Sequence, residues 1–89
     1  MAEIVRRASA GTLESSDAYV ELEPGEGGLE IAVDSVVEAQ FGDDIRASVR
    51  DVLREMGVER ARVRVVDRGA LDCVIRARVE TAVERAKGE

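Results

Sequence analysis

The stretch AYVELEPGEGGLEIAVD, residues 18–34, decides the fold because its apolar residues alternate with polar ones on both sides of a turn. Val20 and Leu22 share one face of an extended chain, and Ile31 and Val33 repeat the pattern after the Pro/Gly-rich turn. Alternation of this kind is typical of a strand with one buried face. A turn between two such strands favours antiparallel pairing, so we predict a β-hairpin over this stretch.

After the hairpin the apolar residues recur at intervals of three and four, which indicates an amphipathic helix. Gly42 interrupts the start of the pattern, so we expect the main helix to begin with Asp43 as its cap. Gly57 is placed to end the helix. The predicted buried stripe is Phe41, Ile45, Val49, Val52, Leu53 and Met56.

A further strand and a second helix complete the pattern. Residues 60–67, RARVRVVD, alternate again and predict a strand with its valines inward and its arginines outward. Helical spacing then returns, with Asp67 as the predicted cap. The second apolar stripe is Leu71, Val74, Ile75, Val79, Ala82, Val83 and Ala86.

Together these elements predict an α+β fold, with a small, mostly antiparallel sheet, the order (β)ββαβα, and two helices packed on one face. The bracketed strand is a short one expected over Gly11–Glu14. We expect a single domain over residues 10–87, preceded by a flexible N-terminal segment over residues 1–9. The other face of the sheet, with its glutamates and arginines, would be solvated or bound to a partner.

The charge of the chain is uneven along its length. The formal net charge is −6, and the stretch from Glu14 to Asp44 holds ten acids and no base. Such a surface repels phosphate backbones and anionic membranes, so we expect no nucleic acid and no membrane partner. It suits a basic groove on a partner protein, or it simply keeps a small protein soluble.

The residue inventory argues against catalysis by this chain. There is no histidine and one cysteine, Cys73, so no catalytic triad, zinc site or internal disulfide is available. Cys73 lies next to the apolar stripe of its helix, and we predict that it packs as a small hydrophobe. We expect no catalytic residue and no metal site. The N-terminus lacks the apolar run of a signal peptide, which favours a cytoplasmic protein.

Serines remain as possible attachment points, because a hydroxyl that only receives a group needs no base of its own. Ser15 and Ser16 precede the predicted hairpin among small and acidic residues, as expected for a surface loop. The alternative is a polar turn in which Asp17 and the serines bond to the local backbone. Ser35, in DSVVE, is a competing candidate that we interpret as a helix cap between strand and helix.

Three blocks in register carry a family resemblance. AGTLESSD (Ala10–Asp17), VEAQFGDDIR (Val37–Arg46) and DRGALDCVIRARVETA (Asp67–Ala82) together resemble the citrate lyase acyl carrier protein family, the gamma subunit of that enzyme. The likeness runs from about Ala10 to Ala86. It implies a non-catalytic carrier with 2'-(5''-phosphoribosyl)-3'-dephospho-CoA joined to a serine by a phosphodiester. The family's modified serine is the first after the Leu-Glu pair, which maps to Ser15.

The resemblance also implies partners. The thiol of the group would carry acetyl and citryl between an alpha subunit, which exchanges them, and a beta subunit, which cleaves citryl to oxaloacetate. A prosthetic-group transferase would attach the group. Three alternatives stay open: a malonate decarboxylase carrier with the same kind of group, an unmodified adaptor subunit, and a phosphopantetheine carrier modified at Ser35.

Overall fold

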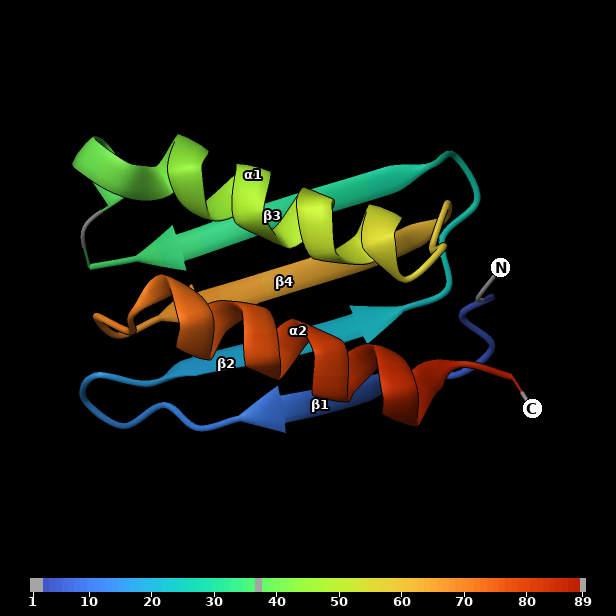
Figure 1. The fold of residues 1–89 in the computed structure, drawn as a ribbon, viewed down its shortest axis with the longest axis horizontal. Helices are drawn as coiled ribbons and strands as arrows, with labels where there is room; N and C mark the ends of the chain where they lie inside the picture. Colours follow the sequence, from blue (N-terminus) through green and yellow to red (C-terminus); the bar gives the residue numbers. More distant parts are fainter. Residues whose placement is uncertain (1–2, 37, 89) are drawn as a thin grey trace.

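The structure is a computed structural model that describes residues 3–36 and 38–88, with the backbone alone at 38 and 39. Two helices cover one face of a four-stranded sheet (Figure 1). This arrangement confirms the predicted α+β fold and its two-layer packing. In chain order the elements are β1 (Ala8–Gly11), β2 (Ala18–Glu23), β3 (Leu29–Ser35), α1 (Glu38–Glu55), β4 (Ala61–Asp67) and α2 (Asp72–Ala86).

The sheet order is β1-β2-β4-β3, so the predicted hairpin of β2 with β3 is wrong. β4 lies between them, antiparallel to β2 and parallel to β3. β4 alternates most sharply between buried and exposed residues, and the centre of the sheet buries its apolar face most fully. The Pro/Gly-rich turn therefore crosses the end of β4, where the Ala61 N–H donates to the Gly28 carbonyl at 3.1 Å.

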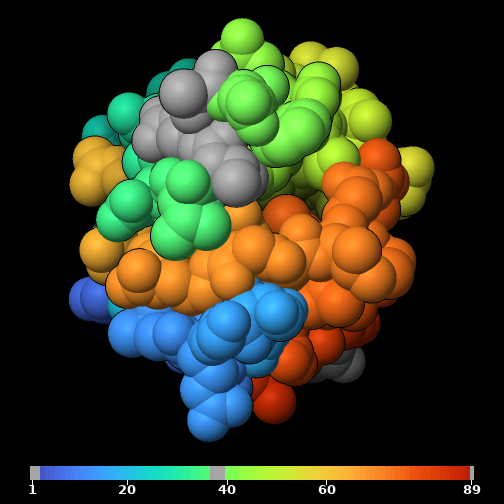
Figure 2. Space-filling view, turned by 90° about the vertical axis from the view of Figure 1, so that its left-hand side faces the viewer, coloured from blue at the N-terminus to red at the C-terminus, as the bar shows by residue number. Residues whose placement is uncertain are grey.

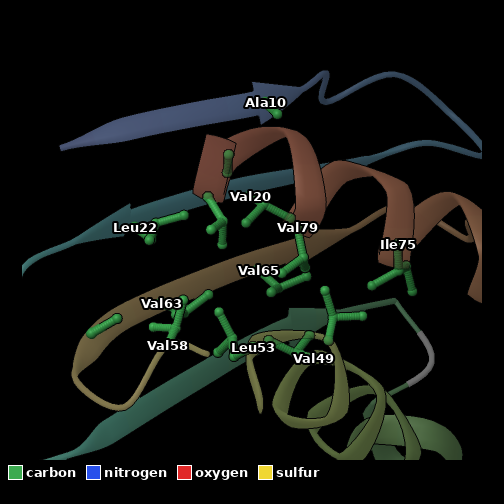
Figure 3. Packing of buried hydrophobic residues seen from close by; sticks show 14 of the residues in the cluster. Ala10, Val20, Leu22, Val49, Leu53, Val58, Val63, Val65, Ile75 and Val79 are labelled. Carbon is green, nitrogen blue, oxygen red and sulfur yellow. The ribbon is translucent and has the colours of Figure 1, made fainter. Parts of the chain in front are cut away.

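Strand register aligns the apolar side chains under the helices. Val65 lies opposite Val20 on one side and Val33 on the other, so three strands contribute to one row. The helices fill the space above this row with aliphatic side chains such as Val49 and Val79 (Figure 3). The core therefore needs no aromatic residue, as the composition requires.

The helix boundaries correct one prediction and confirm another. α1 begins at Glu38 and runs through Gly42, so Asp43 is not its cap. A single glycine costs a helix only about 1 kcal/mol, which tertiary packing readily offsets. At the other end Gly57 has a φ of +77° and its N–H donates to the Arg54 carbonyl at 3.0 Å. Gly57 therefore ends α1, as predicted, in a Schellman motif.

The first strand and the N-terminal residues lie beside α2. The predicted short strand exists, but it covers Ala8–Gly11, four residues long, and not Gly11–Glu14. Before it, Ile4 is buried and forms a β-bridge with Lys87. Flexibility of residues 1–9 stays a prediction. The described residues near both termini lie at one end of the molecule, and the β1–β2 loop lies at the other (Figure 1).

Candidate attachment site at Ser15

Ser15 lies on the tip of the loop that joins β1 to β2. The Asp17 N–H donates to the Glu14 carbonyl at 3.1 Å, so these residues close a β-turn with the two serines at its centre. Ser16 takes the positive φ of +68° that the third position of such a turn can require. Ser15 is exposed, and its hydroxyl makes no hydrogen bond to any residue the structure describes. The predicted surface loop and the predicted polar turn are thus the same feature.

Asp17 fastens the base of this loop through both of its carboxylate oxygens. Thr12 Oγ1 donates to it at 2.6 Å, and the Ala18 N–H donates at 2.7 Å. From α2, the Arg78 guanidinium donates two further bonds, both 3.0 Å. The Thr12 hydroxyl, then Arg78 and the Ala18 amide, lower the pKa of Asp17 to about 2. The carboxylate stays ionised near neutral pH and ties the loop to a helix.

The backbone supplies a second fastening, to the turn between β4 and α2. The Ser16 N–H donates to the Arg68 carbonyl at 2.7 Å, and the Arg68 N–H donates to the Asp17 carbonyl at 2.9 Å. On the other flank, Gly11 has a φ of +96°, and a Cβ there would lie 1.9 Å from the Ala18 carbonyl oxygen. The loop therefore presents one exposed hydroxyl from a firmly held base.

Ser35 lies in a different environment. It is the last residue of β3, half-buried, and its hydroxyl donates to Asp67 Oδ2 at 2.7 Å. Its predicted role as a cap of α1 stays a prediction, because residue 37, between Ser35 and the described start of the helix at Glu38, lies outside the described residues. The phosphopantetheine alternative needs a serine that opens a helix, whereas the described environment of Ser35 is the end of a strand.

Asp67 and Cys73 depart from their predicted roles. Asp67 is buried and accepts from the N–H groups of Gly69 and Ala70, so it caps the turn after β4 and not α2, which has Leu71 at its N-cap. Cys73 is exposed, so the prediction that it packs is wrong. It occupies the second position of α2, on the opposite side from the buried Ile75, because two residues span about 200° of a helix.

Comparisons with known proteins agree with this picture. Residues 5–86 match the acyl carrier family described as malonate decarboxylase delta subunit (MdcD). The citrate lyase acyl carrier protein of Rhodopseudomonas palustris is 52% identical over 86 residues, 97% of this chain and 89% of that protein. That of Vibrio cholerae serotype O1 is 56% identical over 84 residues, 93% of this chain and 86% of that protein.

A solved structure is similar as well. A chain in the crystal structure of a Pseudomonas malonate decarboxylase hetero-tetramer in complex with malonate matches with a TM-score of 0.76 and 26% identity, over 96% of this chain and 93% of that one. Fold and relatives together define the class: a small acyl carrier protein. Within it, the chain belongs to the citrate lyase acyl carrier protein family, as its sequence blocks predict.

Proposed function

We propose that this chain is the carrier subunit of a citrate lyase and that Ser15 is its attachment point. The group would be 2'-(5''-phosphoribosyl)-3'-dephospho-CoA, joined through a phosphodiester to the Ser15 oxygen. The observation that carries the proposal is the exposed Ser15 hydroxyl on a turn that Asp17 and Arg68 hold in place. The reaction served would be cleavage of citrate to acetate and oxaloacetate.

The residues around Ser15 fit a large covalent group. The hydroxyl is exposed, and both neighbours in the turn, Glu14 and Ser16, are exposed too, so a bulky substituent meets open solvent. The hydroxyl holds no structural hydrogen bond within the described chain, so its esterification breaks none of the contacts that close the loop. Ser16 is exposed as well, and the family resemblance is what favours Ser15 over it.

When bound, the group supplies a thiol that holds acetyl or citryl as a thioester. The chain's own contribution is to hold the root of the arm still while the arm reaches the transferase (alpha) and lyase (beta) subunits. This role needs no catalytic side chain, so we propose a non-catalytic subunit. We propose the cytoplasm as its location. Within the described residues, no helix is long and apolar enough to cross a membrane.

A malonate decarboxylase carrier is the second candidate, and the observation that supports it is the similarity to the solved malonate decarboxylase chain. The similar chain in the Pseudomonas hetero-tetramer is, however, 26% identical, about half the identity of the citrate lyase relatives. Both candidates need the same serine anchor. They differ in which enzyme's other subunits accept the loaded carrier, which is a direct test between them.

Intact mass tests the attachment. The carrier is produced together with the enzymes that make and transfer the prosthetic group, so that modification does not depend on enzymes of the expression host. We expect the wild-type chain to gain the mass of the group and Ser15→Ala to stay bare. Ser16→Ala is the matched control and should still be modified. A wild-type chain that stays bare, or an adduct that survives Ser15→Ala, would overturn the assignment.

A further inference from the structure

Exposed apolar side chains collect at the end of the molecule that carries Ser15. Leu13 is 57% exposed, Val36 63%, Phe41 48% and Leu71 71%. They come from the four segments that meet on this end, residues 12–17, 34–36, 41–45 and 67–72, which we call the end face (Figure 2). Phe41 and Leu71 were predicted to be buried in the helix stripes, and their exposure is the departure that calls for a reason.

These side chains are brought together by the contacts of the turn after β4. The Val36 N–H donates to the Asp67 carbonyl at 3.3 Å, and the next residue, Arg68, pairs with the Ser16 backbone. A hollow of about 410 Å³ lies between the first turns of α1 and α2, with Phe41 and Leu71 at its wall. The end face is therefore one continuous surface that runs from the Ser15 loop to this hollow.

Carboxylates lie on the same segments as the exposed apolar side chains. Glu14, Asp34, Asp43 and Asp44 are all exposed on the end face, and Asp72 lines the hollow. Three bases near this end are engaged in ion pairs, and a fourth, Arg68, is exposed on the end face itself. Arg78 is bound to Asp17, Arg76 to Asp72, and Arg46 to Asp43. The face thus combines exposed apolar side chains, which we call its apolar centre, with exposed carboxylates, which we call its acidic rim, and interfaces combine an apolar core with polar residues in the same way.

We propose that the end face is the docking surface for the partner proteins that act on the Ser15 arm, and that such a partner presents an apolar patch ringed by lysines or arginines. The proposal rests on the proposed function for the position of the arm. Opposite charges at the rim would guide the encounter, and burial of Phe41 and Leu71 would hold the complex. Contact on this face brings a partner's site directly to the serine.

Charge also argues against two other occupants of the end face, the prosthetic arm itself and a second copy of this chain. An arm that contains phosphates would be repelled from a hollow lined by Asp44, Asp67 and Asp72. A second copy of this chain would set one acidic rim against another. A basic partner surface is the occupant that gains from the same carboxylates.

Binding measurements on full-length variants test the proposal. Phe41→Ala with Leu71→Ala removes the apolar centre, and Val5→Ala, 50% exposed at the opposite end of the molecule, is the matched control. Binding to the alpha subunit, the beta subunit and the transferase of the same organism is measured separately by biolayer interferometry. We expect the double variant to raise Kd about tenfold or more for at least one of them, and Val5→Ala to change none.

The rim has its own control. Asp34→Asn with Asp44→Asn should slow association and flatten its dependence on salt, while Glu26→Gln with Glu59→Gln, at the other end, should leave both unchanged. Equal binding by all variants would overturn the proposal, as would equal losses in the controls. Melting temperatures within a degree or so of wild type establish that the variants are folded.

Two further readouts separate the alternatives. If alkylation of the loaded carrier's thiol speeds up in the apolar double variant while partner binding is unchanged, the arm occupies the hollow and the proposal fails. If that variant instead abolishes self-association in analytical ultracentrifugation, the occupant is a second copy and the proposal fails. A wild-type chain that binds partners through the end face but gains no mass at Ser15 would overturn the proposed function alone.

Discussion

Arg78 on α2 binds Asp17 on the β1–β2 loop through two hydrogen bonds of 3.0 Å each, across 61 residues of sequence. The guanidinium meets the carboxylate with two parallel N–H groups, the geometry in which such pairs are strongest and most specific in direction. Asp17 is mostly buried, with 15% of its side chain exposed, whereas Arg78 is 39% exposed. The helix that covers the sheet therefore also fixes the loop that presents Ser15.

Asp17→Asn should loosen this loop. The amide keeps the shape of the side chain but offers only one acceptor oxygen where Thr12, Ala18 and Arg78 now share two. We expect the melting temperature to fall by several degrees and the transferase to modify Ser15 with a raised KM. Calorimetry and a time course of intact mass measure the two effects. Glu26→Gln, whose side chain is exposed in the turn between β2 and β3 and away from the end face, should change neither, and a similar loss there would contradict the assigned role.

The same carboxylate makes stability depend on acid. The pKa of Asp17 is about 2 in the folded chain and 3.8 for the ordinary group, so the ionised form stabilises the fold. That contribution is complete above about pH 4 and disappears as the pH falls toward 2. Urea unfolding from pH 6 to pH 2.5 should therefore show the gap between wild type and Asp17→Asn closing below about pH 4. A gap that stays constant with pH would show that ionisation of Asp17 does not matter.

Two leucines distinguish the core from the end face. Leu53 is fully buried, so Leu53→Ala should lower the free energy of unfolding by about 2–5 kcal/mol. Leu71 is 71% exposed, so Leu71→Ala should change it by about 0.5 kcal/mol or less. Urea denaturation at neutral pH measures both. A large loss in Leu71→Ala would mean that this side chain packs within the domain and is not available to a partner.

Gly11, the last residue of β1, and Gly27, in the turn between β2 and β3, offer another matched pair. A Cβ at Gly11 would meet the Ala18 carbonyl oxygen, whereas a Cβ at Gly27 has nothing within 4 Å. We expect Gly11→Ala to destabilise the domain and to slow modification of Ser15, because the loop must shift. Gly27→Ala should be neutral or stabilise by up to about 1 kcal/mol, since it restricts the unfolded chain. Melting temperatures decide between these outcomes, and equal effects would contradict the account of the loop.

The spacing of apolar residues and glycines along the sequence was enough to predict most of the helices and strands. Alternation at Val63 and Val65 and the stop at Gly57 are properties of neighbouring residues, and the structure confirms both. Pairing of β3 was not predictable in this way, because Pro and Gly between two alternating strands indicate a turn but not which strand comes to lie beside them. The choice depends on β4, which lies about 30 residues further on and buries its apolar face best at the centre.

At the candidate site, too, the features that depend on neighbouring residues were predictable and those that depend on distant residues were not. Exposure of Ser15 could be expected from the small and acidic residues around it, and the choice of Ser15 over Ser16 came from family resemblance. The link from Asp17 to Arg78 left no local signal, since each residue alone is an ordinary surface charge. The end face was hidden for the opposite reason, because Phe41 and Leu71 continue the apolar spacing of their helices and yet lie beyond the edge of the core.

Localisation of the prosthetic group within the chain tests the central claim most directly. The carrier is produced with its synthesis and transfer enzymes, and the peptide that carries the added mass is fragmented to find the modified residue. The account predicts that the group is on Ser15 and that Ser16 and Ser35 are bare. A group found on Ser35 or Ser16, or a wild-type chain that remains unmodified beside active transferase, would contradict it.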